Sequence, residues 1–131
     1  MDDKTRAFLD KFHSGVMATT KKNGAPHVAV IGLGLVDGRL WSSGTQTRVR
    51  TRHLRADPRA TLCVFGESRY QWLGAECRVT ILEGDDAAEQ NLALYRVLAG
   101  EPDDVDQYLQ AMQDEQRLIY EFEVVRTYGQ Y

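Results

Sequence analysis

Short runs rich in apolar and β-branched residues, each bounded by turn residues, recur along the chain and are typical of β-strands. The Asn23-Gly24 and Asp37-Gly38 pairs favour hairpin turns, because their positive φ angles match the twist of the flanking strands. We therefore expect six strands, at residues 15–20, 26–36, 39–43, 60–66, 70–82 and 117–129. With few helices between the strands, this pattern predicts a mainly β fold, a small closed antiparallel barrel with peripheral helices.

Apolar positions at helical spacing predict a short amphipathic helix at residues 4–13, with Phe8, Leu9 and Phe12 on one side. Two more helices are expected at residues 85–100 and 102–113, the first closed by Gly100. A further helix should run through the basic segment that begins at residue 48. It should stop at Asp57-Pro58, since the residue before proline avoids the α region.

The chain has 131 residues and a formal net charge of −3, with 43% hydrophobic residues, which suits one folded domain over residues 1–131. The charge is unevenly distributed. Residues 83–123 hold twelve acids and two arginines, a net of −10, and the rest of the chain holds fourteen bases and seven acids, a net of +7. Residues 48–59 alone carry five arginines and one aspartate.

Several classes of protein are disfavoured. No window is long and apolar enough for a membrane span, and the first residues are charged where a signal peptide is apolar, so we expect a cytoplasmic protein. Cys63 and Cys77 lie in apolar runs without CxxC spacing and are interpreted as buried free thiols. The three histidines form no metal-ligand motif, so no metal is expected. Nucleic acid is disfavoured by the overall acidity and by the absence of lysine after Lys22.

The motifs of enzymes that do chemistry with their own side chains are also missing: there is no GxSxG, HExxH or phosphate-binding GKS or GKT sequence. If the protein is an enzyme, a cofactor should therefore carry the chemistry. The best candidate for holding it is the segment SSGTQTRVRTRHLR, in which small and hydroxylated residues lead from a strand into a helix start. Free amides and the positive end of the helix dipole favour an anion there.

Arg48 and Arg50 would add charge-assisted bonds to a phosphate at this helix start. Because residues two apart in a regular helix point in widely different directions, both can reach one phosphate only if the helix has barely begun at Arg48. Arg52, Arg55 and Arg59 then share one face of the following turns. The alternative interpretation is a solvated basic helix face that pairs with the acidic segment.

Tyr70 and Trp72 are two residues apart on one predicted strand, so they should point to the same face, with Gly74 leaving open space beside Trp72. They are either core aromatics or a wall on which a planar ring stacks.

This combination resembles the split-barrel flavin and deazaflavin oxidoreductases, the superfamily of pyridoxamine 5′-phosphate oxidase, and particularly its branch that uses the deazaflavin coenzyme F420. The resemblance spans about Phe8 to Gly129, and its most specific part is the pattern RVRTRHLRADPRA at residues 48–60. It implies an FMN-binding-like split β-barrel of six strands that forms a homodimer with two cofactor sites at the interface. Position 50 is often lysine in relatives and is Arg50 here, which keeps the charge.

By that resemblance, Arg48 and Arg50 bind the cofactor phosphate, residues 42–45 line the path to the ring, residues 27 and 29–31 lie near the ring, and Tyr70 and Trp72 reach over from the partner subunit. The cofactor-binding residues expected from the sequence are thus His27, Ala29, Val30, Ile31, Ser42, Ser43, Gly44, Thr45, Arg48, Val49, Arg50, Arg55, Tyr70 and Trp72. No catalytic side chain is assigned, because none is an obvious proton donor.

F420 continues from a phosphodiester into a tail of glutamates, whereas FMN ends in one phosphate. A tail of carboxylates needs more cations, and Arg52, Arg55 and Arg59 offer them beyond the phosphate pair. The resulting hypothesis is an F420H2-dependent reductase that transfers a hydride to an unsaturated small molecule. An FMN-dependent oxidase or reductase of the same fold, and a cofactor-binding protein without turnover, are the alternatives.

Overall fold

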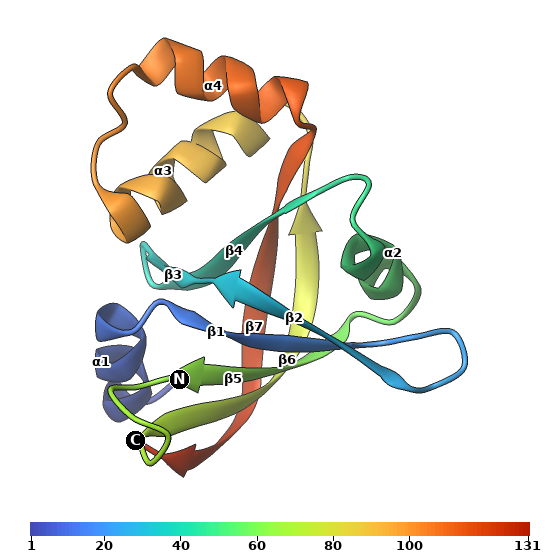
Figure 1. The fold of residues 1–131 in the computed structure, drawn as a ribbon, viewed down its shortest axis with the longest axis vertical. Helices are drawn as coiled ribbons and strands as arrows, with labels where there is room; N and C mark the ends of the chain where they lie inside the picture. The colour runs from blue at the N-terminus through green and yellow to red at the C-terminus, as the bar shows by residue number, and fades with distance from the viewer.

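The computed structural model describes residues 1–131 as one curled antiparallel sheet with four helices around it (Figure 1). The sheet forms a split half-barrel with the strand order β2-β1-β5-β6-β7-β4-β3. In chain order the elements are α1 Asp3–Lys11, β1 Ser14–Thr20, β2 Pro26–Gly32, β3 Gly34–Val36, β4 Arg39–Thr45, α2 Val49–Ala56, β5 Arg59–Phe65, β6 Trp72–Leu82, α3 Ala87–Ala99, α4 Val105–Asp114 and β7 Arg117–Gln130.

The sheet has seven strands, so the expected number of six was wrong. The predicted strand at residues 26–36 is interrupted at Leu33, whose amide donates to the carbonyl of His13 at 2.9 Å outside the strand ladders. Before this break the chain pairs with β1, and after it the chain pairs with β4. β2 and β3 therefore lie at opposite edges of the sheet, and Leu33 is the point where the chain crosses between them.

The two edges are tied together where the barrel curls. Ser42 of β4 donates its hydroxyl to the carbonyl of Gly32 at the end of β2, over 2.6 Å. Because β4 and β2 are not neighbours in the ladder, this side-chain bond satisfies a carbonyl at the edge of the sheet. Ser42 is accordingly almost completely buried.

The core fills the inside of the half-barrel with alternate residues of each strand. Leu62, Leu73, Leu118 and Tyr120, from three neighbouring strands, are fully buried there with Leu9 of α1. A smaller cluster joins the sheet to α3 through the residues Val36, Trp41, Leu94 and Ile119. Full burial of each large aliphatic side chain contributes roughly 1.5–3 kcal/mol before the entropy cost is counted.

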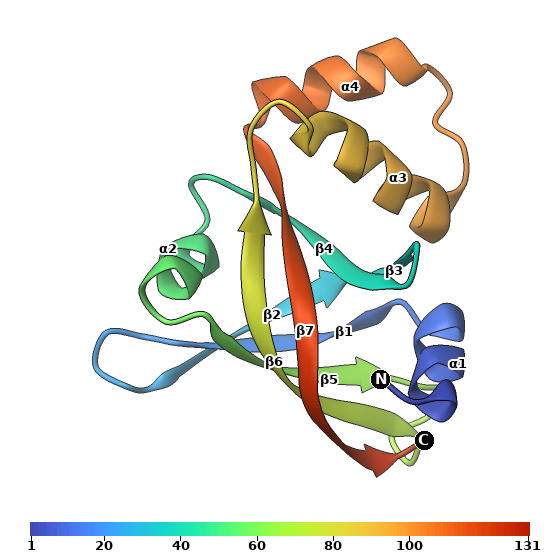
Figure 2. The ribbon, with the colours of Figure 1, turned by 180° about the vertical axis from the view of Figure 1, so that it is seen from behind.

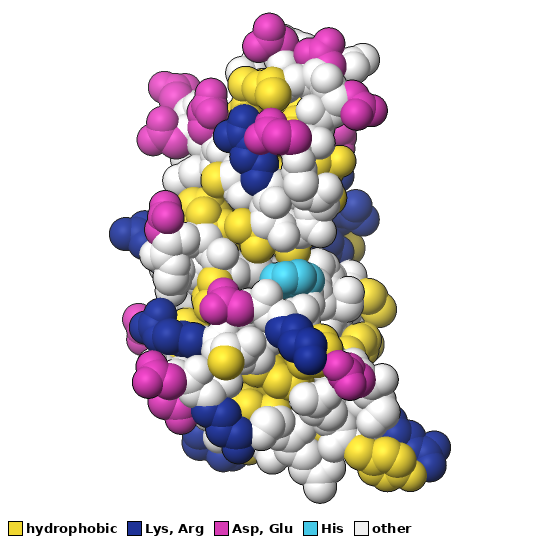
Figure 3. Space-filling model, turned by 90° about the vertical axis from the view of Figure 1, so that its left-hand side faces the viewer, with side chains coloured by type: hydrophobic (Ala, Val, Ile, Leu, Met, Phe, Trp, Pro, Cys, Tyr) yellow, Lys and Arg dark blue, Asp and Glu magenta, His cyan; other side chains and the backbone are white.

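α3 and α4 stack on each other at the end of the long strands β6 and β7 (Figure 2). α4 begins at Val105, three residues later than expected, because Asp104 caps it by accepting a bond from the amide of Gln107 at 3.0 Å. Figure 3 shows Asp and Glu side chains gathered at this end of the molecule, which agrees with solvated helix faces for the acidic segment. None of the helices is long and apolar enough to cross a membrane.

Candidate cofactor site

The start of α2 has the geometry that a phosphate site requires. The helix begins at Val49, and Arg48 precedes it in an extended conformation, with φ −66° and ψ 141°. The side chain of Arg48 makes no capping bond, so the first amides of the helix, those of Val49 and Arg50, have no acceptor within it. Arg48 and Arg50 therefore lie on either side of the first helical residue, Val49. This position is the condition for both arginines to reach one phosphate.

In the basic segment, residues 48–59, the last two arginines form ion pairs and the first three do not. Arg55 donates to Glu83 at 2.8 Å and to the side-chain oxygen of Gln46 at 2.8 Å, and Arg59 pairs with Asp57 at 2.7 Å. The bonds from Arg55 and Gln46 lower the pKa of Glu83 to about 2. Arg48, Arg50 and Arg52 form no ion pair with any carboxylate of the chain. Pairing with the acidic segment, residues 83–123, therefore accounts for the charge of Arg55. It does not account for the charges of Arg48, Arg50 and Arg52.

Two buried side-chain atoms lack any hydrogen-bond partner: Nδ1 of His27 and Nε of Arg50. An unmet buried polar atom costs roughly 1–3 kcal/mol, so such atoms are uncommon without a functional reason. Both belong to residues that the sequence assigned to the cofactor site. Nε of Arg50 is a donor, so the residues present fit a ligand that accepts a hydrogen bond there.

The second histidine at this site, His53 of α2, was missed by the sequence analysis. Its ring lies edge-on to that of His27, with 5.2 Å between centroids, and its Nδ1 is 3.0 Å from the hydroxyl oxygen of Thr19. Burial lowers the pKa of His53, helped by the charges of His27, Arg52 and Lys21, so the neutral ring prevails at pH 7. No sequence signal links two histidines so far apart in the chain, because the packing of α2 on the β1–β2 hairpin brings them together.

The residues before α2 act mainly within the protein. The hydroxyl of Ser43 donates to Asn91 of α3, and that of Thr51 bonds to the carbonyl of Thr45 at 2.7 Å and to the hydroxyl of the buried Tyr120. These bonds fix the path from β4 into α2. Thr51, Asn91 and Tyr120 therefore position the candidate site, although none of them was predicted.

The four residues expected near the ring from β2 lie on both faces of that strand. His27, Ala29 and Ile31 share its inner side, whereas Val30 points outward and is 75% exposed. Within one chain, Val30 therefore does not share a face with the other three.

The expectation that Tyr70 and Trp72 share a strand was wrong. β6 begins at Trp72, and Tyr70 lies in the preceding loop, where it is 67% exposed. The expected open space at Gly74 was also wrong, because a Cβ there would lie 2.4 Å from the ring of Tyr128. This loop and α2 lie at opposite ends of the sheet (Figure 1), so one chain does not bring Trp72 to Arg48.

The curled antiparallel sheet, with a basic helix start beside it, defines a split β-barrel. A sequence profile described as pyridoxamine 5′-phosphate oxidase matches residues 1–131, and the chain belongs to that family. At the level of the family, this membership supports an oxidoreductase.

Solved structures agree with the fold. A conserved hypothetical protein from Mycobacterium tuberculosis has a TM-score of 0.82 and 20% identity, over 97% of this chain and 82% of that one. An F420 reductase has a TM-score of 0.78 and 19% identity, over 99% of this chain and 100% of that one. An FAD-binding protein from Mesorhizobium loti has a TM-score of 0.67 and 17% identity, over 97% and 92%. At these identities the likeness concerns the fold.

Proposed function

We propose that the protein is an F420H2-dependent reductase of unsaturated small molecules. The observation that carries the proposal is the uncapped start of α2, where Arg48, Arg50 and Arg52 lack carboxylate partners and Arg50 and His27 each leave a buried polar atom unmet. When bound, F420H2 supplies a hydride to one end of an acceptor double bond, and a solvent proton completes the other end.

The residues of this chain bind and orient the cofactor. Arg48 and Arg50, with the free amides of the first turn of α2, hold the phosphodiester. His27 offers its unmet Nδ1 to a polar group of the ligand, and the neutral ring of His53 packs edge-on against His27. We assign no side chain as a proton donor. The protein contributes by orienting the cofactor and by the electrostatic field of its charged groups.

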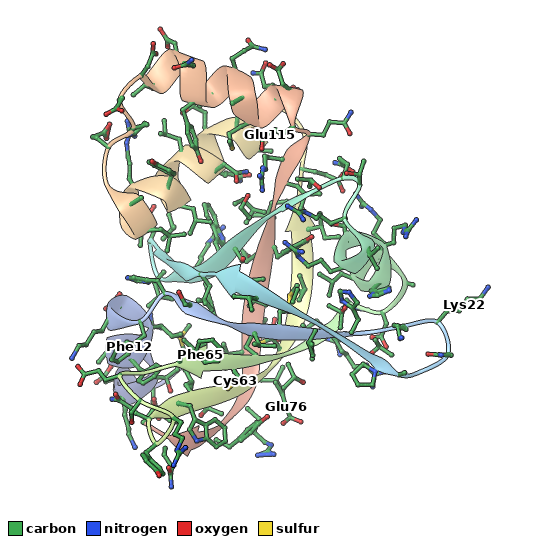
Figure 4. All side chains as sticks on the ribbon, viewed as in Figure 1. Phe12, Lys22, Cys63, Phe65, Glu76 and Glu115 are labelled. Atoms are coloured by element: carbon green, nitrogen blue, oxygen red, sulfur yellow. The ribbon has the colours of Figure 1, made fainter.

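A second group of cations favours F420 over FMN as the ligand. It also shifts the proposed site of the glutamate tail away from Arg55 and Arg59. Arg55 is held by Glu83 and Gln46, as described above. In contrast, Lys21, Lys22 and Arg52 line a cavity of about 740 Å³ between the β1–β2 hairpin and α2, beside His53. Lys22 lies at the tip of that hairpin (Figure 4). Asp57, the one acid in the cavity wall, is bound to Arg59. We place the glutamate tail in this cavity.

The function is tested by titrating the purified protein separately with F420 and with FMN in a calorimeter. We expect F420 to bind more tightly, because only its tail reaches the second group of cations. Oxidation of F420H2 by a panel of unsaturated acceptors, followed by absorbance, then tests turnover. Tighter binding of FMN, or a protein that purifies yellow with flavin, would refute the proposal.

The tail site predicts a difference between two arginines of the same helix. Arg52→Gln should weaken F420 with a long glutamate tail by about two- to fivefold, the value of one exposed ion pair. It should change the affinity for F420 with a shortened tail far less. Arg55→Gln is the matched control, since Arg55 is already bound to Glu83. Calorimetry with both forms of F420 gives the comparison, and equal losses in the two variants would contradict this placement of the tail.

We also propose that the chain forms a homodimer through the outer face of the sheet. The strand registers align Val30, Val16, Cys63, Gly74 and Tyr128 in one row across five strands, on the side opposite the core. Val28, beside this row, is 63% exposed. A contiguous patch of exposed apolar residues on a sheet face marks an interaction surface. Such a dimer would bring Trp72 to the cofactor of its partner. Light scattering that finds only monomers at micromolar concentration would refute it.

A further inference from the structure

An apolar cavity of about 440 Å³ lies beside the loop that joins β5 to β6, away from α2. Phe65 and Trp72, which pair with each other at the ends of the two strands, contribute two aromatic rings to its wall, and Cys63 adds a thiol. Figure 4 shows Cys63 and Phe65 in line along β5, with Phe65 next to the loop. Phe65 is 42% exposed, so an aromatic surface faces the cavity mouth. The volume suits a ligand of one to three rings.

The wall of this cavity is preformed. The amide of Gly66 donates to the carbonyl of Gln71 at 2.8 Å, and the side-chain oxygen of Gln71 accepts from the amide of Glu67 at 3.0 Å, which closes the loop on itself. The indole of Trp72 is fixed on its other side, edge-on to Tyr128 with 5.9 Å between ring centroids. A ligand entering here therefore meets rings that are already in place, which lowers the entropy cost of binding.

One unneutralised cation stands at the rim. Arg69 lines the cavity, donates to the hydroxyl of Tyr70 at 2.7 Å and stacks on that ring at 4.9 Å, but it pairs with no carboxylate. The nearest acid in sequence, Glu67, is bound to Lys11 at 3.1 Å. A guanidinium beside an apolar wall selects an anion that also carries apolar surface.

We propose that this cavity binds a flat aromatic anion, with the rings against Phe65 and Trp72 and the anionic group on Arg69. In the reductase proposed above, on which this second step rests, the dimer brings Trp72 to the cofactor of the partner, so the cavity receives the hydride acceptor. The substrate class is then an unsaturated, ring-containing carboxylate or sulfonate.

The experiment uses two fluorescent probes with the same rings, the anionic anilinonaphthalene sulfonate and the neutral phenylnaphthylamine. We expect one sulfonate bound per chain, with quenching of Trp72. The chain has two tryptophans, so the Trp41→Phe variant makes that signal specific. Arg69→Gln should weaken the sulfonate about tenfold, as expected for one charge-assisted bond, and leave the neutral probe within about twofold. Arg39→Gln, another exposed arginine, is the matched control and should change neither probe.

A second readout does not depend on fluorescence. Calorimetric titration with the sulfonate should give one site per chain in the parent and an about tenfold weaker site in Arg69→Gln. Equal weakening of both probes by Arg69→Gln, or no calorimetric binding of the sulfonate to the parent, would overturn the proposal.

F420 titrations of the same variants separate the two proposals. A protein that binds F420 but shows no charge-selective probe binding refutes the cavity and keeps the function. A protein that binds the sulfonate as expected but not F420 keeps the cavity as a ligand site and refutes the function.

Discussion

The double variant Arg48→Gln/Arg50→Met is expected to lose at least about a hundredfold in affinity for F420 and for FMN. Each charge-assisted bond to a phosphate contributes roughly 1.5–3 kcal/mol, and 1.4 kcal/mol is about a tenfold change in affinity. Neither arginine has a carboxylate partner, so their charge is not used elsewhere in the chain. Calorimetric titration with both cofactors measures the loss.

The same variant should fold as well as the parent, or slightly better. Nε of Arg50 is buried without a partner, and Met at that position removes the unmet group. Thermal unfolding without cofactor gives this comparison. Arg39→Gln is the matched control, because Arg39 is exposed, is paired with Glu121 and lies outside α2 and the cavity beside it, and it should keep full affinity. Unchanged cofactor binding in the double variant would show that Arg48 and Arg50 do not bind the cofactor phosphate.

The strands were largely predictable because each carries its own signal of apolar residues between turn residues. The break at Leu33 was not, since residues 28–36 form one run of apolar residues and glycines in the sequence. What divides that run is a contact distant in the chain, the bond from Leu33 to the carbonyl of His13. Likewise, Tyr70 and Trp72 alternate with Gln71 and Leu73 as in a strand, and only the bonds of Gln71 show that Tyr70 lies in a loop.

The candidate site divides in the same way. The place of Arg48 and Arg50 at the start of α2 was predictable because a helix start is a local feature, indicated by Ser, Gly and Thr before the arginines and by Asp57-Pro58 after them. The pairing of Arg55 with Glu83 and the meeting of His27 with His53 depend on how distant elements pack. Sequence spacing gives the direction of a side chain along its own helix, and it does not identify the group that faces it.

Gly44→Ala is expected to destabilise the protein by about 3 kcal/mol, a large part of the 5–15 kcal/mol typical of a domain. A Cβ at this position would lie 2.3 Å from the ring and hydroxyl of Tyr120, which is fully buried and cannot move outward. The ring must shift, and its bond to Thr51 is lost with it. Because that bond holds the first turn of α2 against the sheet, affinity for the cofactor should fall as well. Urea unfolding and F420 titration measure the two effects.

Gly32→Ala is the matched control for this clash. Gly32 is also a strand glycine, but its nearest neighbour, a methyl group of Leu98, would lie 3.5 Å from the new Cβ, an ordinary contact. It should cost less than about 1 kcal/mol. On a Tyr120→Leu background, Gly44→Ala should become nearly neutral, since the overlapping ring is gone. The changes in the free energy of unfolding caused by the substitutions at positions 44 and 120 could instead be additive. That result would contradict the proposal that the fit of Tyr120 against Gly44 positions the start of α2.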